Sequence, residues 1–287
     1  MKRIFELGKS SYRFLRRWLR ISRFYAGGEK PWSRGYFEYK WRAIAKAIND
    51  PRLRQLFERG GNLPRGYGFG IDERIIELPW ALAQLSEQPL SLLDAGSALN
   101  FLPLIIHSKL KNKKLTIITL APETNNFSRQ GVRYTYGDMR KLRFADQAFD
   151  AITCISTLEH VGLDNQAIYT HEQKYAENHP ADYLVALKQL YRVLRPGGTL
   201  LLTVPFGQYV NIGFMQQFTP EMVDKVVSVC PWKQSVVTYY KYHSGGWDVS
   251  TREQAEGVKY FNIHTTKKIE ADGAAAARAV ACIKLTK

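Results

Sequence analysis

Two adjacent residues, Glu159 and His160, have side chains suited to proton transfer. They follow Ala151–Ile155, an apolar segment that predicts a buried strand. Because histidine titrates near neutral pH, His160 could take a proton from an acceptor hydroxyl or amine, with Glu159 in support. A plainer interpretation is equally open, in which His160 only caps or hydrogen-bonds a nearby helix. The pair is a candidate catalytic site whose geometry depends on the elements around it.

A small loop forms a second candidate site. The apolar run Leu90–Leu93 leads into Asp94, and Gly96 and Ser97 follow before a helix-compatible pattern over Phe101–Leu110. At the carboxyl end of a parallel strand, such a loop lies where ligands bind, since small residues let backbone N–H groups approach. An ordinary strand-to-helix connection has the same pattern, so the loop alone identifies no ligand.

The elements that position both sites alternate between strands and helices. This alternation predicts a doubly wound, mostly parallel α/β sheet with helices on both faces. Core strands are expected at Ser91–Asp94, Leu115–Thr119, Arg133–Tyr136, Ala151–Ile155 and Thr199–Val204, and two closing strands at Val236–Tyr240 and Ala279–Leu285. Ala181–Leu194 is the clearest helix, and Thr219 and Pro220 are typical of the start of another.

Four segments, taken in order, resemble the class I S-adenosylmethionine-dependent methyltransferases, and most closely their small-molecule, methyltransferase-11-like branch. They are the Asp94 loop, Gly137-Asp138-Met139, Leu158-Glu159-His160-Val161 and the Arg192–Gly198 segment with the strand after it. The resemblance spans Leu90–Pro205. It implies a Rossmann-like fold with an antiparallel edge hairpin, S-adenosylmethionine as cofactor, and a small-molecule acceptor.

The resemblance also implies which residues contact the cofactor. Asp94 and the loop of Gly96 and Ser97 would hold its methionine end, and Asp138 would accept a hydrogen bond from its adenine amine. The other candidate cofactor contacts are Asn100, Thr119, Glu123, Met139 and Ser156. Glu159 and His160 would face the transferred methyl group.

Two positions depart from the pattern of the resembled family. Thr119 stands where an acidic residue usually binds both ribose hydroxyls, and Glu123 is the carboxylate that could replace it. Ala98 and Asn100 stand where the loop usually has further glycines. These departures leave a degenerate, non-catalytic partner protein as the alternative function.

Two further regions could shape an acceptor pocket. Segments before the first strand cover the pocket in similar methyltransferases, although a structural cap is the simpler interpretation of most of this region. Its candidate pocket residues are Tyr67, Arg74, Glu77 and Trp80. The long polar insert Gly162–Pro180 is a candidate lid. By analogy with uncharacterised methyltransferases, the preferred acceptor is a sugar or glycolipid precursor of a surface polysaccharide.

The net charge of +15 is concentrated near the N-terminus. The first 60 residues hold 16 of the 41 Lys and Arg but only 5 of the 26 Asp and Glu, a net +11 against +4 for the rest. This distribution argues against the further alternative, a nucleic-acid methyltransferase. Residues 1–25 predict a basic amphipathic helix, which could lie on an anionic membrane or pack on protein, and both alternatives remain open.

The sequence predicts three parts: a basic helix and linker at 1–28, a helical cap at 29–88, and the cofactor-binding core at 89–287. The three cysteines are widely spaced and show neither a disulfide framework nor zinc-binding spacing. No apolar run is typical of a transmembrane helix or a signal peptide. We therefore expect a cytoplasmic protein without a metal, whose contact with a membrane would be peripheral and on its inner face.

Overall fold

The computed structural model describes residues 18–166 and 172–287. Most of the helix predicted over residues 1–25 therefore lies outside the described residues. In the described parts, no helix is both long and apolar enough to cross a membrane.

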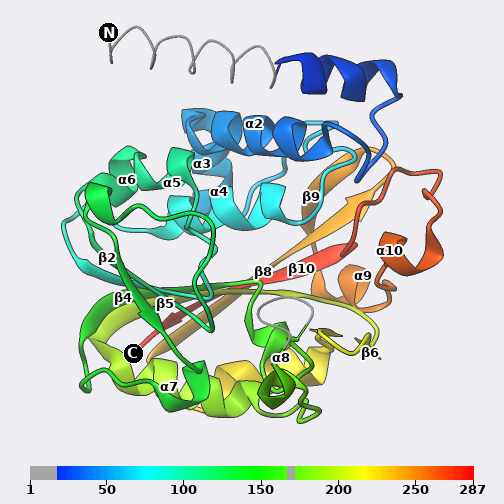
Figure 1. The fold of residues 1–287 in the computed structure, drawn as a ribbon. Coiled ribbons are helices and arrows are strands. Elements are labelled where there is room, and N and C mark those ends of the chain that lie inside the picture. The colour runs from blue at the N-terminus through cyan, green and yellow to red at the C-terminus, as the bar shows by residue number, and fades with distance from the viewer. Residues whose placement is uncertain (1–17, 167–171) are drawn as a thin grey trace, which may run out of the picture.

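Eight strands in the described residues form one sheet, in the order β3-β2-β1-β4-β5-β10-β8-β9 (Figure 1). Strands β1 to β5 are parallel, as predicted, and β10, β8 and β9 continue the sheet with antiparallel pairs. The strands are β1 Ser91–Ala95, β2 Lys114–Thr119, β3 Arg133–Tyr136, β4 Phe149–Ile155, β5 Leu194–Pro205, β8 Gln234–His243, β9 Gly246–Ser250 and β10 Ala279–Thr286, with a separate ladder of β6 Val210–Asn211 and β7 Gln216–Gln217.

The antiparallel edge is confirmed, although its hairpin differs from the expected one. The two predicted closing strands, β8 and β10, pair with each other, but β8 forms the hairpin with β9. The sequence reasoning missed β9. The turn before it depends on Gly246, whose φ of 98° is a left-handed conformation that favours glycine.

Helices cover both faces of the sheet (Figure 1). One face carries α2 Tyr36–Ile48, α3 Pro51–Arg59, α4 Arg74–Gln84, α5 Leu102–Ile105 and α6 Ser108–Lys111, and the other carries α7 Tyr183–Val193 and α8 Pro220–Ser228. Two short helices, α9 Arg252–Glu256 and α10 Ile263–Thr266, follow β9. The single helix expected over Phe101–Leu110 is divided into α5 and α6, because His107 is extended and caps α6 by accepting from the Lys109 amide.

Alternating side chains of the strands separate the core into two layers. Leu92 of β1 packs with the buried residues of α4, whereas its neighbour Leu93 packs with those of α7. Side-chain caps begin the helices on both faces: Asp50 accepts from two amides of α3, and Thr219 accepts from the Met222 amide of α8, as predicted. Helices therefore pack on both faces of the sheet, and this packing holds the strand ends in place.

The chain before α2 is helical over residues 18–26 and packs on the domain. Ile21 and Phe24 are buried, and the Phe24 ring stacks on Tyr39 at a centroid distance of 4.7 Å. The helical spacing of the sequence predicts Trp18 and Tyr25 on the same apolar face as Ile21, yet they are 52% and 50% exposed. The segment therefore uses a narrower face for packing than the sequence predicted, and it leaves aromatic side chains in solvent.

Candidate functional site

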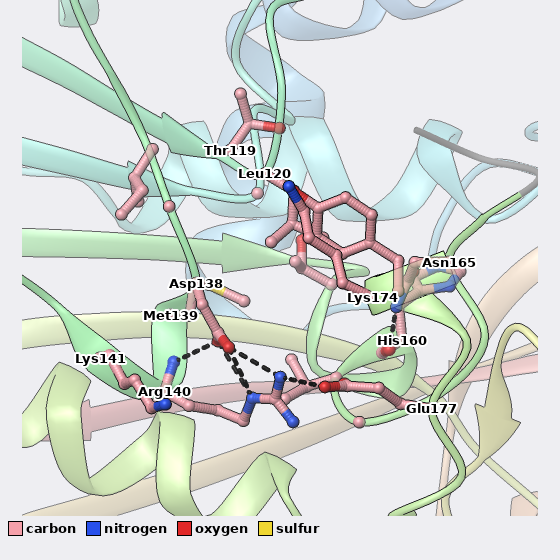
Figure 2. Close-up of a pocket in the computed structure, with 17 residues that line it drawn as sticks. Thr119, Leu120, Asp138, Met139, Arg140, Lys141, His160, Asn165, Lys174 and Glu177 are labelled. Carbon is pink, nitrogen blue, oxygen red and sulfur yellow. Dashed lines mark hydrogen bonds and ion pairs between the residues drawn. The ribbon is translucent and has the colours of Figure 1, made fainter. Parts of the chain in front are cut away.

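A cavity of about 350 Å³ opens at the carboxyl ends of β1 to β4 (Figure 2). A cavity of this size is typical of a site for a small molecule. It brings together five of the predicted site residues: Gly96, Thr119, Asp138, Met139 and His160. We call it the first cavity.

The loop after β1 is held from beneath by Asp94. This carboxylate is fully buried and accepts hydrogen bonds from the Leu99 amide, at 2.8 Å, and from the Thr153 hydroxyl, at 2.9 Å. Burial raises the pKa of Asp94 to about 7. Asp94 does not line the first cavity, so the structure places it beneath the loop.

Gly96 is required by close packing in the same loop. Its φ is 109°, and a Cβ at this position would lie 2.1 Å from the Thr157 hydroxyl oxygen. No larger residue fits without moving the loop that follows β4. The loop therefore presents backbone, and not a side chain, to the cavity at this point.

Glu123 lies at the end of β2, where the sequence suggested a replacement for the missing acidic residue. Its carboxylate accepts from the Ser97 hydroxyl at 2.8 Å, from the Asn100 amide at 3.0 Å and from the Thr119 hydroxyl at 3.4 Å. The carboxylate is thus fixed beside the loop after β1, by three of the residues that the sequence singled out.

Asp138 follows β3 and is held by Arg140, a residue that the sequence reasoning missed (Figure 2). Arg140 donates to Asp138 through Nε at 2.9 Å and Nη2 at 2.7 Å. The same guanidinium donates to Glu177 at 2.7 Å and to Asp182 at 2.6 Å. Arg140 therefore joins the cavity wall after β3 to the end of the insert and the start of α7.

The insert after His160 begins and ends at one contact. The His179 amide donates to the Gly162 carbonyl at 2.6 Å, and Gly162 has a φ of 78°. A Cβ on Gly162 would lie 2.2 Å from the His179 carbonyl oxygen. Glycine therefore permits the close approach of the two ends.

Asn165, another residue that the sequence reasoning missed, directs an unused acceptor toward the first cavity. Its side-chain amide donates to the His160 and Leu163 carbonyls, each at 2.8 Å. Its Oδ1 atom is buried and has no hydrogen-bond partner among the described residues. Because a buried acceptor without a partner is costly, this atom fits a ligand that donates an N–H or O–H group.

One ring nitrogen of His160 forms a hydrogen bond within the protein. Nδ1 lies 2.7 Å from the Phe214 carbonyl oxygen, and the ring stacks on Phe214 with an interplanar angle of 15°. Since a carbonyl only accepts, Nδ1 carries the hydrogen and Nε2 carries the lone pair. Burial lowers the pKa of His160 to about 4, so the ring is neutral at pH 7.

A second cavity, of about 240 Å³, lies on the other side of the loop after β4 and shares His160 with the first. Ser156 and Glu159 line this second cavity, so the structure separates Ser156 from the other predicted cofactor contacts. Ser156 has a φ of 45°, and its hydroxyl donates to Glu159 Oε1 at 2.5 Å. Burial raises the pKa of Glu159 to about 7.

The helical cap contributes Arg74 to the second cavity. Arg74 donates to the Ile155 carbonyl at 3.2 Å and to Glu77 at 3.2 Å, and Glu77 also accepts from the Thr203 hydroxyl. Tyr67 instead donates its hydroxyl to the Ile75 carbonyl, and Trp80 is buried in the core. Of the four cap residues considered from sequence, Arg74 reaches the cavity and Glu77 supports it.

Part of the core resembles known proteins in its sequence. Residues 96–202 match a family model described as a methyltransferase domain, and the order of β3, β2, β1, β4 and β5 is that of a doubly wound cofactor-binding sheet. This match shows that residues 96–202, a part of the core, are similar to a methyltransferase domain. A search of curated proteins gave no match to this chain.

Solved structures similar to this chain include a 1,6-didemethyltoxoflavin-N1-methyltransferase from Burkholderia thailandensis. It is 14% identical, with 70% of this chain and 72% of that chain covered and a TM-score of 0.43. A possible histamine N-methyltransferase from Thermotoga maritima is 16% identical, with 86% and 99% covered and a TM-score of 0.46. Likenesses at this level do not bear on the substrate.

The residues around the first cavity fit S-adenosylmethionine, the cofactor of the resembled class. The cofactor presents hydrogen-bond donors on its ammonium, ribose and adenine groups. Asp138 and the unpaired Oδ1 of Asn165 are acceptors in the lining, and Glu123 lies outside the lining but is bonded to its residue Thr119. The backbone of the Gly96 loop supplies the close approach that a bound ligand needs.

Proposed function

We propose that this protein transfers a methyl group from S-adenosylmethionine, held in the first cavity, to a hydroxyl or amine of a small molecule held in the second. The observation that carries the proposal is the position of His160, which lines both cavities. A side chain shared by two cavities can contact a donor in one and an acceptor in the other.

The chain's part in such a reaction is alignment and proton transfer. The methyl group of a sulfonium is already activated, so the protein mainly aligns the acceptor and removes its proton. His160 is neutral and has its Nε2 lone pair available for a proton. Glu159, which is held by Ser156 in the second cavity, is the neighbouring group that could support or replace it.

For the cofactor we propose one group of residues at each strand end. The backbone of Gly96 and Ser97 would hold the methionine end, with Asp94 acting through the loop that it braces. Glu123, together with Thr119 and Asn100, would bind the ribose hydroxyls. Asp138 and Met139 would bind the adenine, and Ser156 would act on the acceptor side.

For the acceptor we propose a sugar or a glycolipid precursor of a surface polysaccharide. The class is proposed by family analogy, and the polar lining of the second cavity supports it. A nucleic-acid acceptor is disfavoured because the basic excess belongs to the first 60 residues and not to the core.

Two measurements test the proposed function. Isothermal titration should show binding of S-adenosylmethionine and of S-adenosylhomocysteine to the purified protein. Mass spectrometry should then detect S-adenosylhomocysteine when an acceptor is supplied. No heat and no thermal shift at millimolar cofactor would instead support the alternative of a degenerate, non-catalytic partner protein.

We also propose that the N-terminal segment brings a cytoplasmic enzyme to the inner face of a membrane. Residues 1–25 carry eight Lys and Arg against one Glu. Where this segment is described, Trp18, Leu19 and Tyr25 are exposed beside Arg23. Exposed aromatic and basic side chains together are typical of a helix that binds an anionic interface.

A further inference from the structure

We infer that the second cavity is a binding site for a protonated amine. It would bind a small molecule through an ammonium group, which the buried carboxyl groups of Glu73 and Glu159 attract. That this molecule is the methyl acceptor rests on the function proposed above, whereas the binding itself requires no methyl transfer.

The first observation is a pair of carboxylate oxygens without partners. Glu159 is 1% exposed and lines the cavity, and its Oε1 is bonded to Ser156 while its Oε2 has no partner among the described residues. Glu73 lines the same cavity, and its Oε2 is likewise buried and without a partner in the described parts of the chain. When the carboxyls are ionised, both atoms can only accept, so each calls for a hydrogen-bond donor that the described residues do not supply.

The second observation is the balance of charge around the cavity. Its other charged groups form pairs: Lys40 lies 2.7 Å from Asp72, and Arg74 lies 3.2 Å from Glu77. These pairs leave Glu73 and Glu159 outside any ion pair, and they share only the longer-range attraction of Arg74. An ammonium group would supply both the missing positive charge and N–H donors, whereas a neutral hydroxyl would supply only a donor.

The remaining walls suit an organic cation. Aromatic side chains from Phe214, Tyr260 and Phe261 line the cavity beside the carboxylates. Apolar walls lower the local dielectric, which strengthens attraction between a buried carboxylate and a bound cation. The same walls disfavour an anion, because it would meet two carboxylates of its own sign.

The titration behaviour of the two carboxyls agrees with this geometry. Burial raises the pKa of Glu73 to about 8 and that of Glu159 to about 7. The charged groups that face them are Asp72, Arg74 and Glu77, with Lys40 behind Asp72, and the neutral His160 ring. A bound cation would lower both pKa values, so binding near pH 7 would release protons.

The experiment is isothermal titration of the full-length protein, without cofactor, with two matched sets of probes. The first set is glucosamine, glucose and glucuronate, and the second is benzylamine, benzyl alcohol and benzoate. The amine of at least one set should bind more tightly than its neutral and anionic counterparts by about tenfold or more. Titration in buffers of different ionisation enthalpy should show proton release for the amine alone.

Three variants locate the binding. Glu159→Gln and Glu73→Gln should each weaken amine binding by about tenfold or more and reduce the proton release. Glu58→Gln removes a carboxylate that lines a different cavity, and it should change neither quantity. Thermal unfolding of each variant confirms that it is folded before its affinity is compared.

Three outcomes would overturn the inference. They are equal or tighter binding of the neutral or anionic probes, no binding of either amine at about 10 mM, and amine binding that survives both Gln substitutions. A parallel titration with S-adenosylmethionine separates this result from the proposed function. Cofactor binding without selective binding of an amine would remove only the inference, whereas amine binding without cofactor binding would remove only the proposed function.

Discussion

The Nδ1 atom of His160 lies 2.7 Å from the carbonyl oxygen of Phe214. This bond fixes the tautomer of the ring, and burial holds its pKa at about 4. The histidine is therefore a neutral base throughout the range in which most enzymes work. Glu159, its neighbour, titrates instead near pH 7 because burial raises its pKa.

His160→Ala should lower the turnover of methyl transfer by ~10²–10⁴-fold, the usual contribution of a general base. Cofactor affinity should be nearly unchanged. His160→Gln keeps much of the size and hydrogen bonding but not the basicity, so a similar loss in both variants indicates proton transfer. The measurement is the initial rate of S-adenosylhomocysteine formation at saturating acceptor.

The pH profile separates the two candidate bases. If His160 takes the proton, the rate should fall only as the pH approaches 4, where the ring becomes charged. A fall through pH 7 that persists in His160→Gln would assign the role to Glu159, whose carboxyl becomes protonated there. Wild-type turnover in His160→Ala would rule out the histidine altogether.

Glu123→Ala should weaken binding of S-adenosylmethionine by about 1–3 kcal/mol, the scale for a hydrogen bond to a charged group. Because Glu123 is exposed, its loss should leave the unfolding temperature almost unchanged. Asp94→Ala should weaken binding to a similar extent but also lower the unfolding temperature, since the buried carboxylate holds the loop. Isothermal titration and thermal unfolding give both quantities, with Glu253→Ala as the control.

The stability of the ligand-free protein should fall as the pH rises from about 5 to 8. The folded-state pKa of Glu159, about 7, lies above its ordinary value of 4.5. Its contribution is therefore fully present below pH 4.5 and is lost as the pH rises through 7. Glu159→Gln removes this loss, which is on the order of 3 kcal/mol for a shift of this size.

Urea unfolding of the wild type and of Glu159→Gln at several pH values provides the test. The free energies of unfolding should diverge above pH 5, and the variant should become the more stable of the two at pH 8. His160 and the other buried carboxyls are common to both proteins, so their effects cancel in the difference. If the free energies of unfolding of the two proteins instead change with pH in parallel, the pKa of Glu159 is not raised in the folded state.

Arg140→Met should loosen the insert and weaken cofactor binding together. The substitution leaves Asp138, Glu177 and Asp182 without their shared cation, at a cost of about 1–3 kcal/mol. Limited proteolysis should then cut faster between residues 172 and 182. Arg252→Met, which breaks a surface pair with Asp224, is the matched control and should change neither the cleavage rate nor the affinity.

Replacing Trp18, Leu19 and Tyr25 together by serine should reduce sedimentation with vesicles that contain anionic lipid. All three side chains are exposed, so the substitutions should not affect the fold or the affinity for S-adenosylmethionine. Phe37→Ser removes an equally exposed aromatic residue from α2 and should have no effect. Equal sedimentation of the triple variant and the wild type would argue against a membrane role.

Much of the core could be predicted from sequence because its signals are local. Four of the five parallel strands contain apolar runs, whereas β3 alternates tyrosine with polar residues. Thr219 and Pro220 begin α8 as their types predict. The helix expected over Phe101–Leu110 failed because the cap formed by His107 depends on an extended backbone, which no periodic pattern reveals.

The candidate site was only partly predictable, for a different reason. Gly96, Asp138 and His160 belong to local motifs, and they lie together because parallel strands end at one edge of the sheet. Arg140 and Asn165 were missed because their roles depend on partners 37 and 42 residues away, or on an acceptor left unpaired by folding. The placement of Ser156 and Glu159 in a second cavity likewise depends on the cap, which lies far off in the sequence.

Gly162 and His179 bring the two ends of the insert to one point. The residues between them leave and rejoin the core at one place, and Glu177 gives them a further contact with Arg140. Lengthening a loop whose ends are already adjacent costs little additional entropy. The insert can therefore change while β4 and α7 keep their positions. It can diverge in length and composition, in evolution or by design, without any change to the sheet.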